Sequence, residues 1–248
     1  MGTKEIKIVS WKDGSWEDIA NMIEAHYNGI IHISSYWNTG ETKRVELTNG
    51  EIVDLVLIGN RHDNLVNSIN GITKAAFTIQ TKNCLEKKER IFSHNNSFRY
   101  SLWVESEVRN FLNIKFKESL PDGLQTLIKP VKKETYRYSG GNHIANIRAT
   151  VITEDEIFLL SETECYGRQE LGTEYKCGRG TDGVQYEYYE INSRIKHLGI
   201  DGDSIDWWLR SSIVYSCGYS GFRFVSSYGN VNSNDANLYK GLAPAFCI

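Results

Sequence analysis

The residues of this 248-residue chain that could carry out acid–base or metal chemistry are few and scattered. His62 and Asp63 stand side by side in "GNRHDN" after an apolar run, which could be half of a catalytic or metal site. Adjacent residues on a strand point to opposite faces, and no H-x-H or HExxH pattern completes a ligand set. Since Asp and Asn readily bond the local backbone, the pattern favours a turn held by side chains.

The five cysteines are widely separated and include no CxxC pair: Cys84, Cys165, Cys177, Cys217 and Cys247. An odd number of scattered cysteines fits reduced thiols better than a disulfide framework. Cys165 and Cys177 have no matching histidines, so the spacing does not predict a zinc site.

Other reactive patterns are incomplete. The serines of "LLSETE" and "LRSS" lack the GxSxG context of a hydrolase nucleophile. The glycines of "CGRGTDG" are not followed by GK[ST], which favours an irregular loop over a phosphate loop. Five acidic residues suggest calcium but flank a strand instead of filling a DxDxDG loop: Glu154, Asp155, Glu156, Glu162 and Glu164. We therefore expect no catalytic residue, cofactor or metal ion.

The overall composition is that of an ordinary globular protein, with 40% apolar and 24% charged residues. A net charge of -3 and a pI near 6.1 give no electrostatic footprint for nucleic acid. No stretch of 18 apolar residues predicts a membrane span, and the first residues show no secretory signal.

Local patterns predict the elements that position these residues. Alternation over residues 4–10 predicts a strand, and Ser15 with Asp18 begins a helix that ends near Gly29. "TNG" between residues 43–47 and 51–59 predicts a hairpin.

Further along the chain, residues 101–121 and 183–202 predict helices, residues 122–131 a helical turn, and residues 157–160 a strand. No linker divides the sequence. We expect a single α+β domain over residues 1–248, with mixed antiparallel strands, two or three helices, and C-terminal strands that complete the sheet.

The C-terminal segment, residues 206–248, begins and ends with core-like sequence. In "DWWLRSS", alternation sends Trp207 and Leu209 to one face and Trp208 and Arg210 to the other. Both faces then need cover, and Arg210 should stack on a ring or pair with a carboxylate. "GFRFVSSYGNV" predicts two strands around a turn at residues 228–230, and "GLAPAFCI" predicts a buried terminal strand.

Between these ends the composition changes. Of the 31 residues from Ser211 to Gly241, 20 are Ser, Asn, Tyr, Gly or Asp, and three are charged. Tyrosine offers a large contact area with few torsions to freeze, and Ser, Asn and Gly offer adaptable hydrogen bonding, as in antibody paratopes. Ordinary polar loops would have a similar composition.

The run "WWLRS", followed some 30 residues later by "LAPAFCI", resembles a family found in bacteriophages of gut bacteria and in their hosts, filed as a domain of unknown function. Other segments, such as "SWEDIANMIEAHYNG" and "SLWVESEVRNFLN", resemble the family in the same order. The C-terminal part of such proteins is similar to the C-type-lectin-like fold, in its formylglycine-generating-enzyme-like subtype. That fold carries the variable proteins of diversity-generating retroelements.

In those systems an error-prone reverse transcriptase changes adenines in the 3' end of the gene, so AAY codons diversify while scaffold codons are spared. The resemblance implies a set of variable, ligand-facing positions: Tyr215, Ser216, Tyr219, Ser220, Arg223, Ser226, Ser227, Tyr228, Asn230, Asn232, Ser233, Asn234, Asp235, Asn237 and Tyr239. We expect Phe222, Phe224, Val225, Gly229, Val231 and Ala236 to anchor the segment internally.

The sequence departs from the family in places. Ser212 stands where members often have proline, and Lys240 cannot arise from an AAY codon by changes at adenine. The EPN, QPD and WND triplets of calcium lectins are absent. No paired cysteine site near the terminus supports formylglycine-generating chemistry.

The resemblance implies a non-enzymatic protein with a diversifiable surface, on a phage tail as a receptor-binding or tail-associated protein, or on a bacterial surface. Its partner would be a host-surface protein or glycan, with no nucleic acid and no membrane insertion, and it could form a homo-oligomer on a virion. One alternative is an enzyme of the formylglycine-generating kind or a hydrolase of a phage module, which predicts a pocket with a Cys, Cys pair or a His, Asp pair within hydrogen-bond reach. A structure with His62, Cys217 and Cys247 far apart would exclude it. Another is a structural scaffold of a virion or cell surface.

Overall fold

The structure is a computed structural model that describes residues 6–86, 91–92, 103–137, 149–167, 182–214 and 220–248. These residues form antiparallel strand pairs and short helices, which confirms the expected mixed α+β class. The described part has more helices than the two or three expected: α1 (Trp16–Tyr27), α2 (Glu107–Phe111), α3 (Lys117–Ser119), α4 (Asp122–Gln125), α5 (Glu162–Tyr166) and α6 (Glu187–Ile191).

The central sheet has five antiparallel strands in the order β1-β2-β5-β14-β8. Their bounds are β1 Thr42–Glu46, β2 Ile52–Asn60, β5 Phe77–Thr81, β14 Ala245–Cys247 and β8 Ile157–Phe158. The terminal strand β14 lies between β5 and β8 and pairs with both. Residues 241–248 are all buried, so the predicted terminal strand is confirmed and completes this sheet from its interior.

The hairpin between β1 and β2 forms where "TNG" predicted it. Leu47 N donates to Glu51 O at 2.8 Å, and Gly50 has a φ of +81° at the turn. Glycine adopts that conformation without a steric penalty, which explains the turn.

Three smaller antiparallel groups complete the strands. One has the order β4-β3-β6-β7, with β3 Asn64–Ile69, β4 Ile72–Lys74, β6 Val131–Arg137 and β7 Ala149–Asp155. A second is β11-β12-β13, with β11 Trp207–Val214, β12 Ser220–Val225 and β13 Val231–Asn234. The third pairs β9 Lys196–His197 with β10 Ser204–Ile205. Strands β11 to β13 therefore form their own sheet instead of extending the central one.

Helix α1 begins as predicted, because the Ser15 side chain accepts a hydrogen bond from Asp18 N. The predicted strand over residues 4–10 is wrong for its described part, residues 6–10. There Val9 N donates to Met22 Sδ at 3.3 Å, and Val9 O accepts from Trp37 Nε1 at 2.9 Å. Side chains, and not a neighbouring strand, bond the backbone of Val9, and Ser10 O accepts from Gly14 N at 3.0 Å in a local turn.

The helix predicted over residues 101–121 is present from Glu107 to Ser119 but contains a π-helical segment, η3 (Leu112–Phe116), between α2 and α3. A 3₁₀ turn, η2 (Trp103–Glu105), precedes it, and a second one, η1 (Ile33–Ser35), follows α1. Helix α4 confirms the predicted helical turn after Pro121.

The predicted helix over residues 183–202 is mostly wrong, because only α6 is helical. Asn192 ends it in an extended conformation, and its Nδ2 donates to Tyr188 O at 2.8 Å. The chain then turns into β9 and β10.

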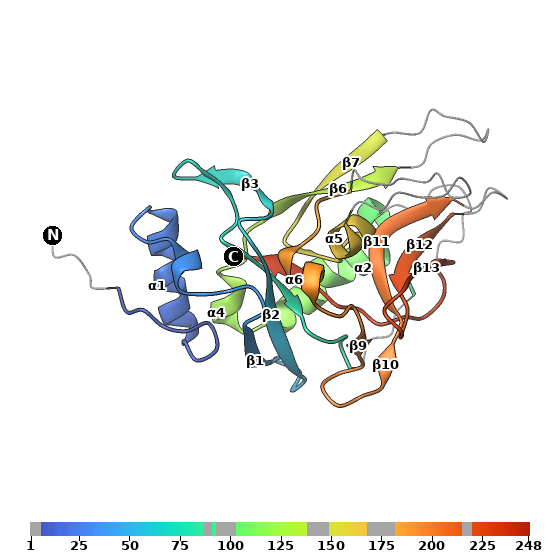
Figure 1. Cartoon of the computed structure of the whole chain (residues 1–248), viewed down its shortest axis with the longest axis horizontal. Coiled ribbons are helices and arrows are strands. Elements are labelled where there is room, and N and C mark those ends of the chain that lie inside the picture. Colours follow the sequence, from blue (N-terminus) through green and yellow to red (C-terminus); the bar gives the residue numbers. More distant parts are fainter. Residues whose placement is uncertain (1–5, 87–90, 93–102, 138–148, 168–181, 215–219) are drawn as a thin grey trace.

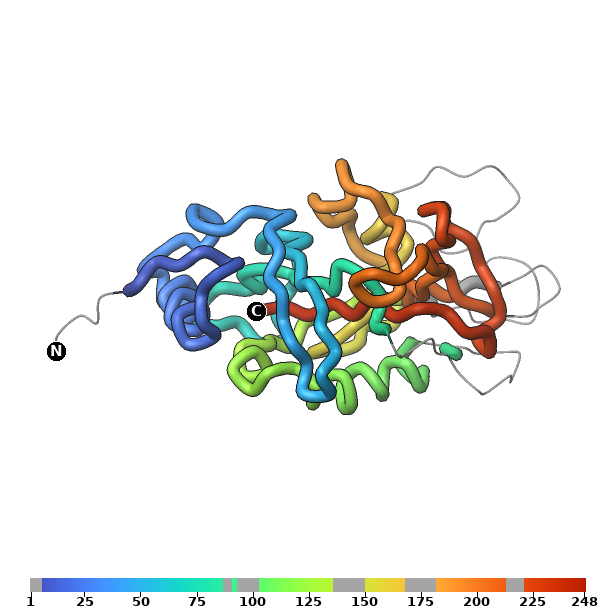
Figure 2. The backbone as a smooth tube through the Cα atoms, turned by 90° about the horizontal axis from the view of Figure 1, so that it is seen from below, coloured from blue at the N-terminus to red at the C-terminus, as the bar shows by residue number. Residues whose placement is uncertain are grey.

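The molecule is elongated, with α1 at one end and β11, β12 and β13 at the other (Figure 1). Seen from below, the C-terminal chain runs from the hairpin end into the middle of the molecule (Figure 2). The buried apolar side chains form one cluster that includes Trp37, Phe77, Trp208 and Phe246. In the described residues, none of the helices is long and apolar enough to cross a membrane.

Candidate functional site

The candidate binding surface is built on β11, whose residues Trp207, Trp208, Leu209 and Arg210 are all fully buried. Both faces of this strand are covered, as the alternation predicted. Trp208 packs edge-on against Phe224, and Trp207 Nε1 donates to Arg194 O at 3.0 Å. The frame of the segment is therefore part of the core.

The exposed tip of the segment is the turn between β12 and β13, residues 226–230. Ser226 N donates to Asn230 O at 2.8 Å, and Gly229 N donates to Ser226 O at 2.8 Å. Gly229 has a φ of +84°, so this is a three-residue hairpin loop with glycine in the left-handed region. The sequence "SSYGN" thus determines both the turn and the position of Tyr228.

Two contacts hold this turn against the body of the protein. Tyr166 Oη donates to Gly229 O at 2.8 Å. An added Cβ on Gly229 would lie 3.2 Å from Ile195 Cγ1, so the turn packs closely on Ile195. The turn is therefore braced, although Tyr228 itself is 83% exposed.

Asp206 connects three parts of the segment. Its Oδ1 accepts from Ser227 N at 2.9 Å, its Oδ2 pairs with Lys240 Nζ at 2.9 Å, and its backbone O accepts from Gly241 N at 2.8 Å. Lys240 is buried, and its ammonium lies 3.6 Å from the Phe224 ring centroid. Lys240, which fitted a diversified position least well, is therefore a scaffold residue.

The described candidate positions other than Arg223 fall into two groups by exposure, and the anchors are more buried. Six are exposed: Tyr228, Asn230, Asn232, Asp235, Asn237 and Tyr239. Four are half-buried: Ser226, Ser227, Ser233 and Asn234. The anchors Phe222, Phe224, Val225 and Ala236 are buried, and Gly229 and Val231 are half-buried.

Arg223 does not lie with the exposed candidates. It is buried, and its Nε lies 2.9 Å from Glu162 Oε2. A ligand would have to displace Glu162 to reach it, so we correct its assignment to a scaffold position. Tyr215, Ser216 and Tyr219 lie outside the described residues, and so does the side chain of Ser220.

A buried ionic network lies behind β11 and was not predicted as a whole. Lys133 Nζ lies 2.6 Å from Asp63 Oδ1 and 2.6 Å from Glu164 Oε1. Arg210 donates to both carboxylate oxygens of Glu164 and to Leu159 O and Asp182 O. The predicted carboxylate partner of Arg210 is thus confirmed as Glu164. For Lys133, the sequence held one signal of burial: in β6 it alternates in phase with the buried Val131 and Thr135.

The charges of this network stabilise one another. Burial opposes the charge on Lys133, but Asp63 and Glu164 outweigh it and raise its pKa. Burial likewise opposes the carboxylate charges, yet Lys133 and His62 hold the pKa of Asp63 well below its usual value. Arg210 and Lys133 similarly lower the pKa of Glu164. Asp182 differs, because burial raises its pKa although Ser211 and Thr163 donate hydrogen bonds to it.

His62 and Asp63 do not form the backbone-bonded turn that the sequence suggested. Asp63 accepts from Lys133, from Tyr186 Oη at 2.8 Å and from Thr78 Oγ1 at 2.5 Å. The His62 ring stacks on Tyr186 with 4.0 Å between centroids. These long-range partners come from β6, β5 and the start of α6, which a local pattern cannot reveal.

Cys247 also lies in this cluster, with its Sγ 3.5 Å from Asp63 Oδ2. Burial, followed by the charge of Asp63, raises the pKa of the Cys247 thiol well above its usual value. A buried, protonated thiol is a poor nucleophile. Cys217, the other cysteine of the enzyme alternative, lies outside the described residues.

Four of the five acidic residues that suggested calcium pair with basic side chains. Asp155 accepts from Arg109 Nε at 2.5 Å, and Glu156 lies 2.6 Å from Lys117 Nζ. Glu162 and Glu164 pair with arginines, as above. Within the described ranges, no three His, Cys, Asp or Glu side chains are grouped so as to hold a metal ion.

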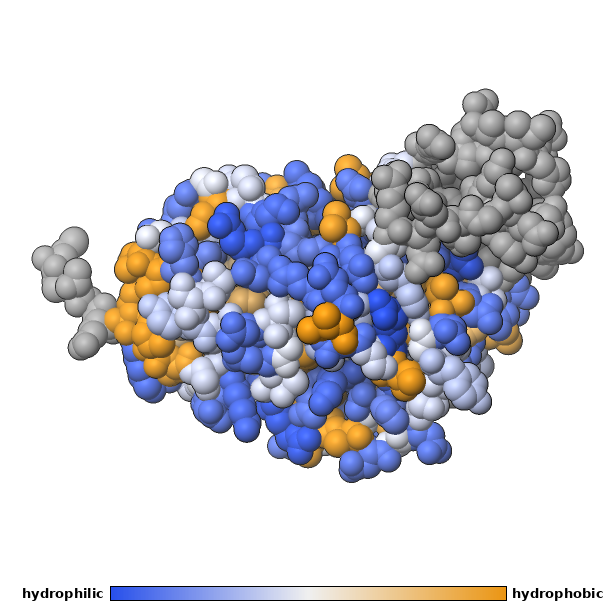
Figure 3. Space-filling model, viewed as in Figure 1, coloured by the Kyte–Doolittle hydropathy of each residue, from blue (hydrophilic) through white to orange (hydrophobic). Residues whose placement is uncertain are grey.

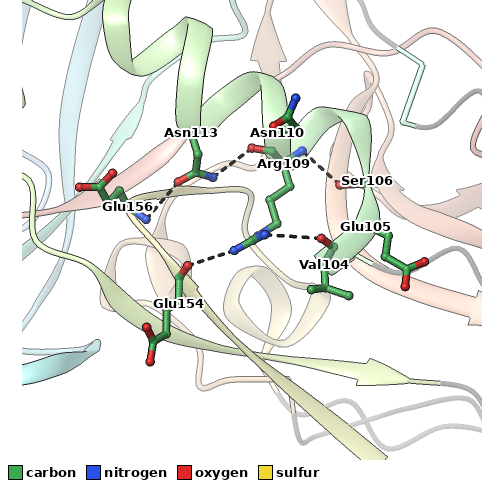
Figure 4. A pocket seen from close by; sticks show the side chains of 8 residues that line it. All are labelled: Val104, Glu105, Ser106, Arg109, Asn110, Asn113, Glu154 and Glu156. Carbon is green, nitrogen blue, oxygen red and sulfur yellow. Dashed lines mark hydrogen bonds between the residues drawn. The ribbon is translucent and has the colours of Figure 1, made fainter.

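A pocket of about 310 Å³ lies between the α2 helix and the end of β7. Figure 4 shows Arg109 reaching across it, with its guanidinium bonded to Glu154 O and Val104 O. The Asn113 side chain bridges from the helix to Glu156 N. Because the guanidinium already binds Asp155 and two carbonyls, its donors are occupied by structural contacts and we assign the pocket no ligand.

Together, the fold and surface define an antiparallel α+β protein that presents an almost uncharged polar hairpin on a buried aromatic frame. Residues 75–248 match the family model described as a domain of unknown function, DUF6273. This match covers more than half of the chain, so the chain belongs to that family. No curated protein and no solved structure matches the chain.

Proposed function

We propose that this protein is a non-enzymatic binding protein whose ligand-contacting surface lies on the C-terminal segment, residues 206–248. The observation that carries the proposal is the division of this segment into buried and exposed positions. Four anchors are buried, six candidate positions between Tyr228 and Tyr239 are exposed, and a frame of fully buried residues holds both ends. Such a surface can change its exposed side chains without changing its core.

The proposed mechanism of binding is shape and hydrogen-bond complementarity. Tyr228 and Tyr239 are 83% and 67% exposed and offer flat amphipathic contact area. The neighbouring asparagines offer donors and acceptors in several directions. Repeated copies on a multimeric particle would raise effective affinity where single contacts are weak.

More specifically, we propose a C-type-lectin-like scaffold of the formylglycine-generating-enzyme-like subtype, used as the variable protein of a diversity-generating retroelement. The location would be a phage tail or a bacterial surface, and the ligand a host-surface protein or glycan. The resemblance of the C-terminal motif supports this. So does the exposure of six of the eleven described candidate positions.

Binding to cell-envelope fractions of gut bacteria tests the proposal. Replacing Tyr228 and Tyr239 together with alanine should lower binding at least tenfold, because interface tyrosines are frequent hot spots. Tyr36 is 41% exposed and lies beside α1, so Tyr36→Ala is a matched control that should leave binding unchanged. Equal binding by all three proteins would rule out the surface and favour a structural scaffold.

Sequencing the 3' end of the gene from a population tests the diversification. Substitutions should concentrate at the exposed candidates and spare the codons of Phe222, Phe224 and Lys240. An even spread of substitutions over exposed and buried codons would contradict it.

A further inference from the structure

Strand β13 forms the outer edge of the three-stranded sheet in the described residues, next to β12 (Figure 1). An outer strand presents backbone N–H groups that can pair with another extended chain. The bond from Ser226 N to Asn230 O closes the hairpin and sets the register. Because hydrogen-bonded and non-bonded pairs alternate, Asn232 and Asn234 direct their N–H groups toward β12. Val231, Ser233 and Asp235 then direct theirs outward.

Two of these three outward N–H groups, those of Ser233 and Asp235, are already bonded; the third belongs to Val231, at the turn end of β13. Ser233 N donates to Asn232 Oδ1 at 2.8 Å, and Asp235 N donates to Asn234 Oδ1 at 3.0 Å. In each case the acceptor is the side chain of the preceding residue. The same contact thus occurs twice, two residues apart, along one edge.

We infer that Asn232 and Asn234 close the outer edge of β13 to strand addition, so that this surface fits a folded partner that contacts side chains. An extended peptide, or β13 of a second copy, would first have to displace both carboxamides from the N–H groups. The edge also ends at Asp235, whose charge opposes close pairing with a second β13. That the partner is a folded one rests on the proposed function, whereas the closure of the edge does not.

The inference limits which residues these two positions can hold. Asn232 is exposed and Asn234 half-buried, so neither is needed for the core. A side chain without an acceptor oxygen would leave the outward N–H groups free. A β-branched one would in addition favour strand pairing.

The first test compares self-association of the full chain and the N232V/N234V variant by light scattering over a range of concentrations. We expect the variant to form dimers or larger species at concentrations where the wild-type mass is constant. The N230V/N237V variant adds the same two side chains at exposed positions of the same segment. It should keep the wild-type mass. Equal masses for all three proteins, or equal association of both variants, would overturn the inference.

The second test reads the two bonds directly. In N232A/N234A, the amides of Ser233 and Asp235 should exchange hydrogen about tenfold faster or more, while amides of β12 keep their rates. N232D/N234D retains acceptor oxygens and should keep slow exchange and the wild-type mass in high salt, which screens the added charge. Unchanged exchange in N232A/N234A would refute the closure. The binding assay with the Tyr228 and Tyr239 variant tests the proposed function alone. Mass and hydrogen exchange test the closed edge, so each proposal can be refuted independently of the other.

Discussion

At the scale of single residues, the least expected feature is the set of buried charges behind β11. Lys133 is 2% exposed and Arg210 fully buried, and each lies against carboxylates from other parts of the chain. Taking charges out of water is costly, and attraction between partners repays it only with good geometry. The network therefore ties β6, α5 and β11 into one arrangement, since removing any member leaves another charge without compensation.

Replacing Lys133 with methionine tests this dependence. The variant leaves Asp63 and Glu164 buried without their shared ammonium, and we expect the free energy of unfolding to fall by about 3–5 kcal/mol. Urea unfolding monitored by circular dichroism measures the loss. Arg44 pairs with Asp54 at the surface with its side chain 62% exposed, so Arg44→Met should cost about 1 kcal/mol at most. A similar small loss for both variants would contradict the structural role of the network.

Lys196 gives a prediction on pH dependence. Its ammonium donates to Thr81 O and Lys82 O at 2.9 Å each, and burial lowers its pKa from 10.5 to about 8. Between these values the unfolded chain binds more protons than the folded one, so stability rises with pH across this window. Relative to Lys196→Met, the wild-type free energy of unfolding should rise by up to about 1.4 kcal/mol per pH unit from pH 8 upward. Below pH 8 the difference should be constant.

Denaturant unfolding at a series of pH values measures this difference. The exposed Lys12 provides the control, because in Lys12→Met the free energy of unfolding should rise above pH 8 as it does in the wild type. A wild-type profile parallel to that of Lys196→Met above pH 8 would show that Lys196 is not desolvated.

At the scale of elements, the π-helical segment η3 is held by one side chain. Asn113 Nδ2 donates to Ile157 O at 2.8 Å and to Arg109 O at 3.0 Å. Its Oδ1 accepts from Glu156 N at 3.1 Å and Ile157 N at 3.0 Å. The carboxamide thereby bonds the backbone where β7 passes into β8, as a neighbouring strand would.

We therefore expect Asn113→Ala to lower the free energy of unfolding by about 2–3 kcal/mol, because two backbone N–H groups lose their partner. Thermal or urea unfolding measures the loss, and hydrogen exchange at Glu156 and Ile157 should become faster. Asn110 lines the pocket beside α2 together with Asn113 but is exposed. Asn110→Ala should therefore change the free energy of unfolding by less than about 0.5 kcal/mol. If the two variants are equally stable, Asn113 does not hold the element.

Elements defined by local chemistry were predictable from the sequence, and elements defined by distant partners were not. Gly50, Gly229 and the Ser15 cap act within a few residues, and each turn or helix start is confirmed. The π-helix depends on hydrogen bonds between Asn113 and Ile157, and α6 ends at Ile191, ahead of β9, which begins at Lys196. The hairpin of β12 and β13 was predicted from its local strand and turn pattern, whereas the burial of Arg223 depends on Glu162, which is 61 positions away in the sequence.

At the scale of the whole molecule, the part that matches the family shares its central sheet and its buried charges with residues that precede it. Residues 75–248 contain β5, β14 and β8 of the central sheet, but β2 pairs along β5 from before that segment. Asp63 also precedes it and bonds Lys133 and Tyr186 inside it. On the face in Figure 3 most of the surface is hydrophilic, and apolar side chains gather mainly at the α1 end. The N-terminal residues thus complete the core that the matched segment begins.

We therefore expect residues 75–248 expressed alone to lack a cooperative unfolding transition. The truncation would uncover the edge of β5, where Leu57 faces Ile79, and leave the buried Lys133 without Asp63. Exposed strand edges and unpaired buried charges each destabilise a fold and favour aggregation. Near-ultraviolet circular dichroism and urea unfolding measure the outcome, with residues 6–248 as the control that should unfold like the full chain. A cooperative transition of residues 75–248 at the same urea midpoint would show that the C-terminal surface is supported by the matched segment alone.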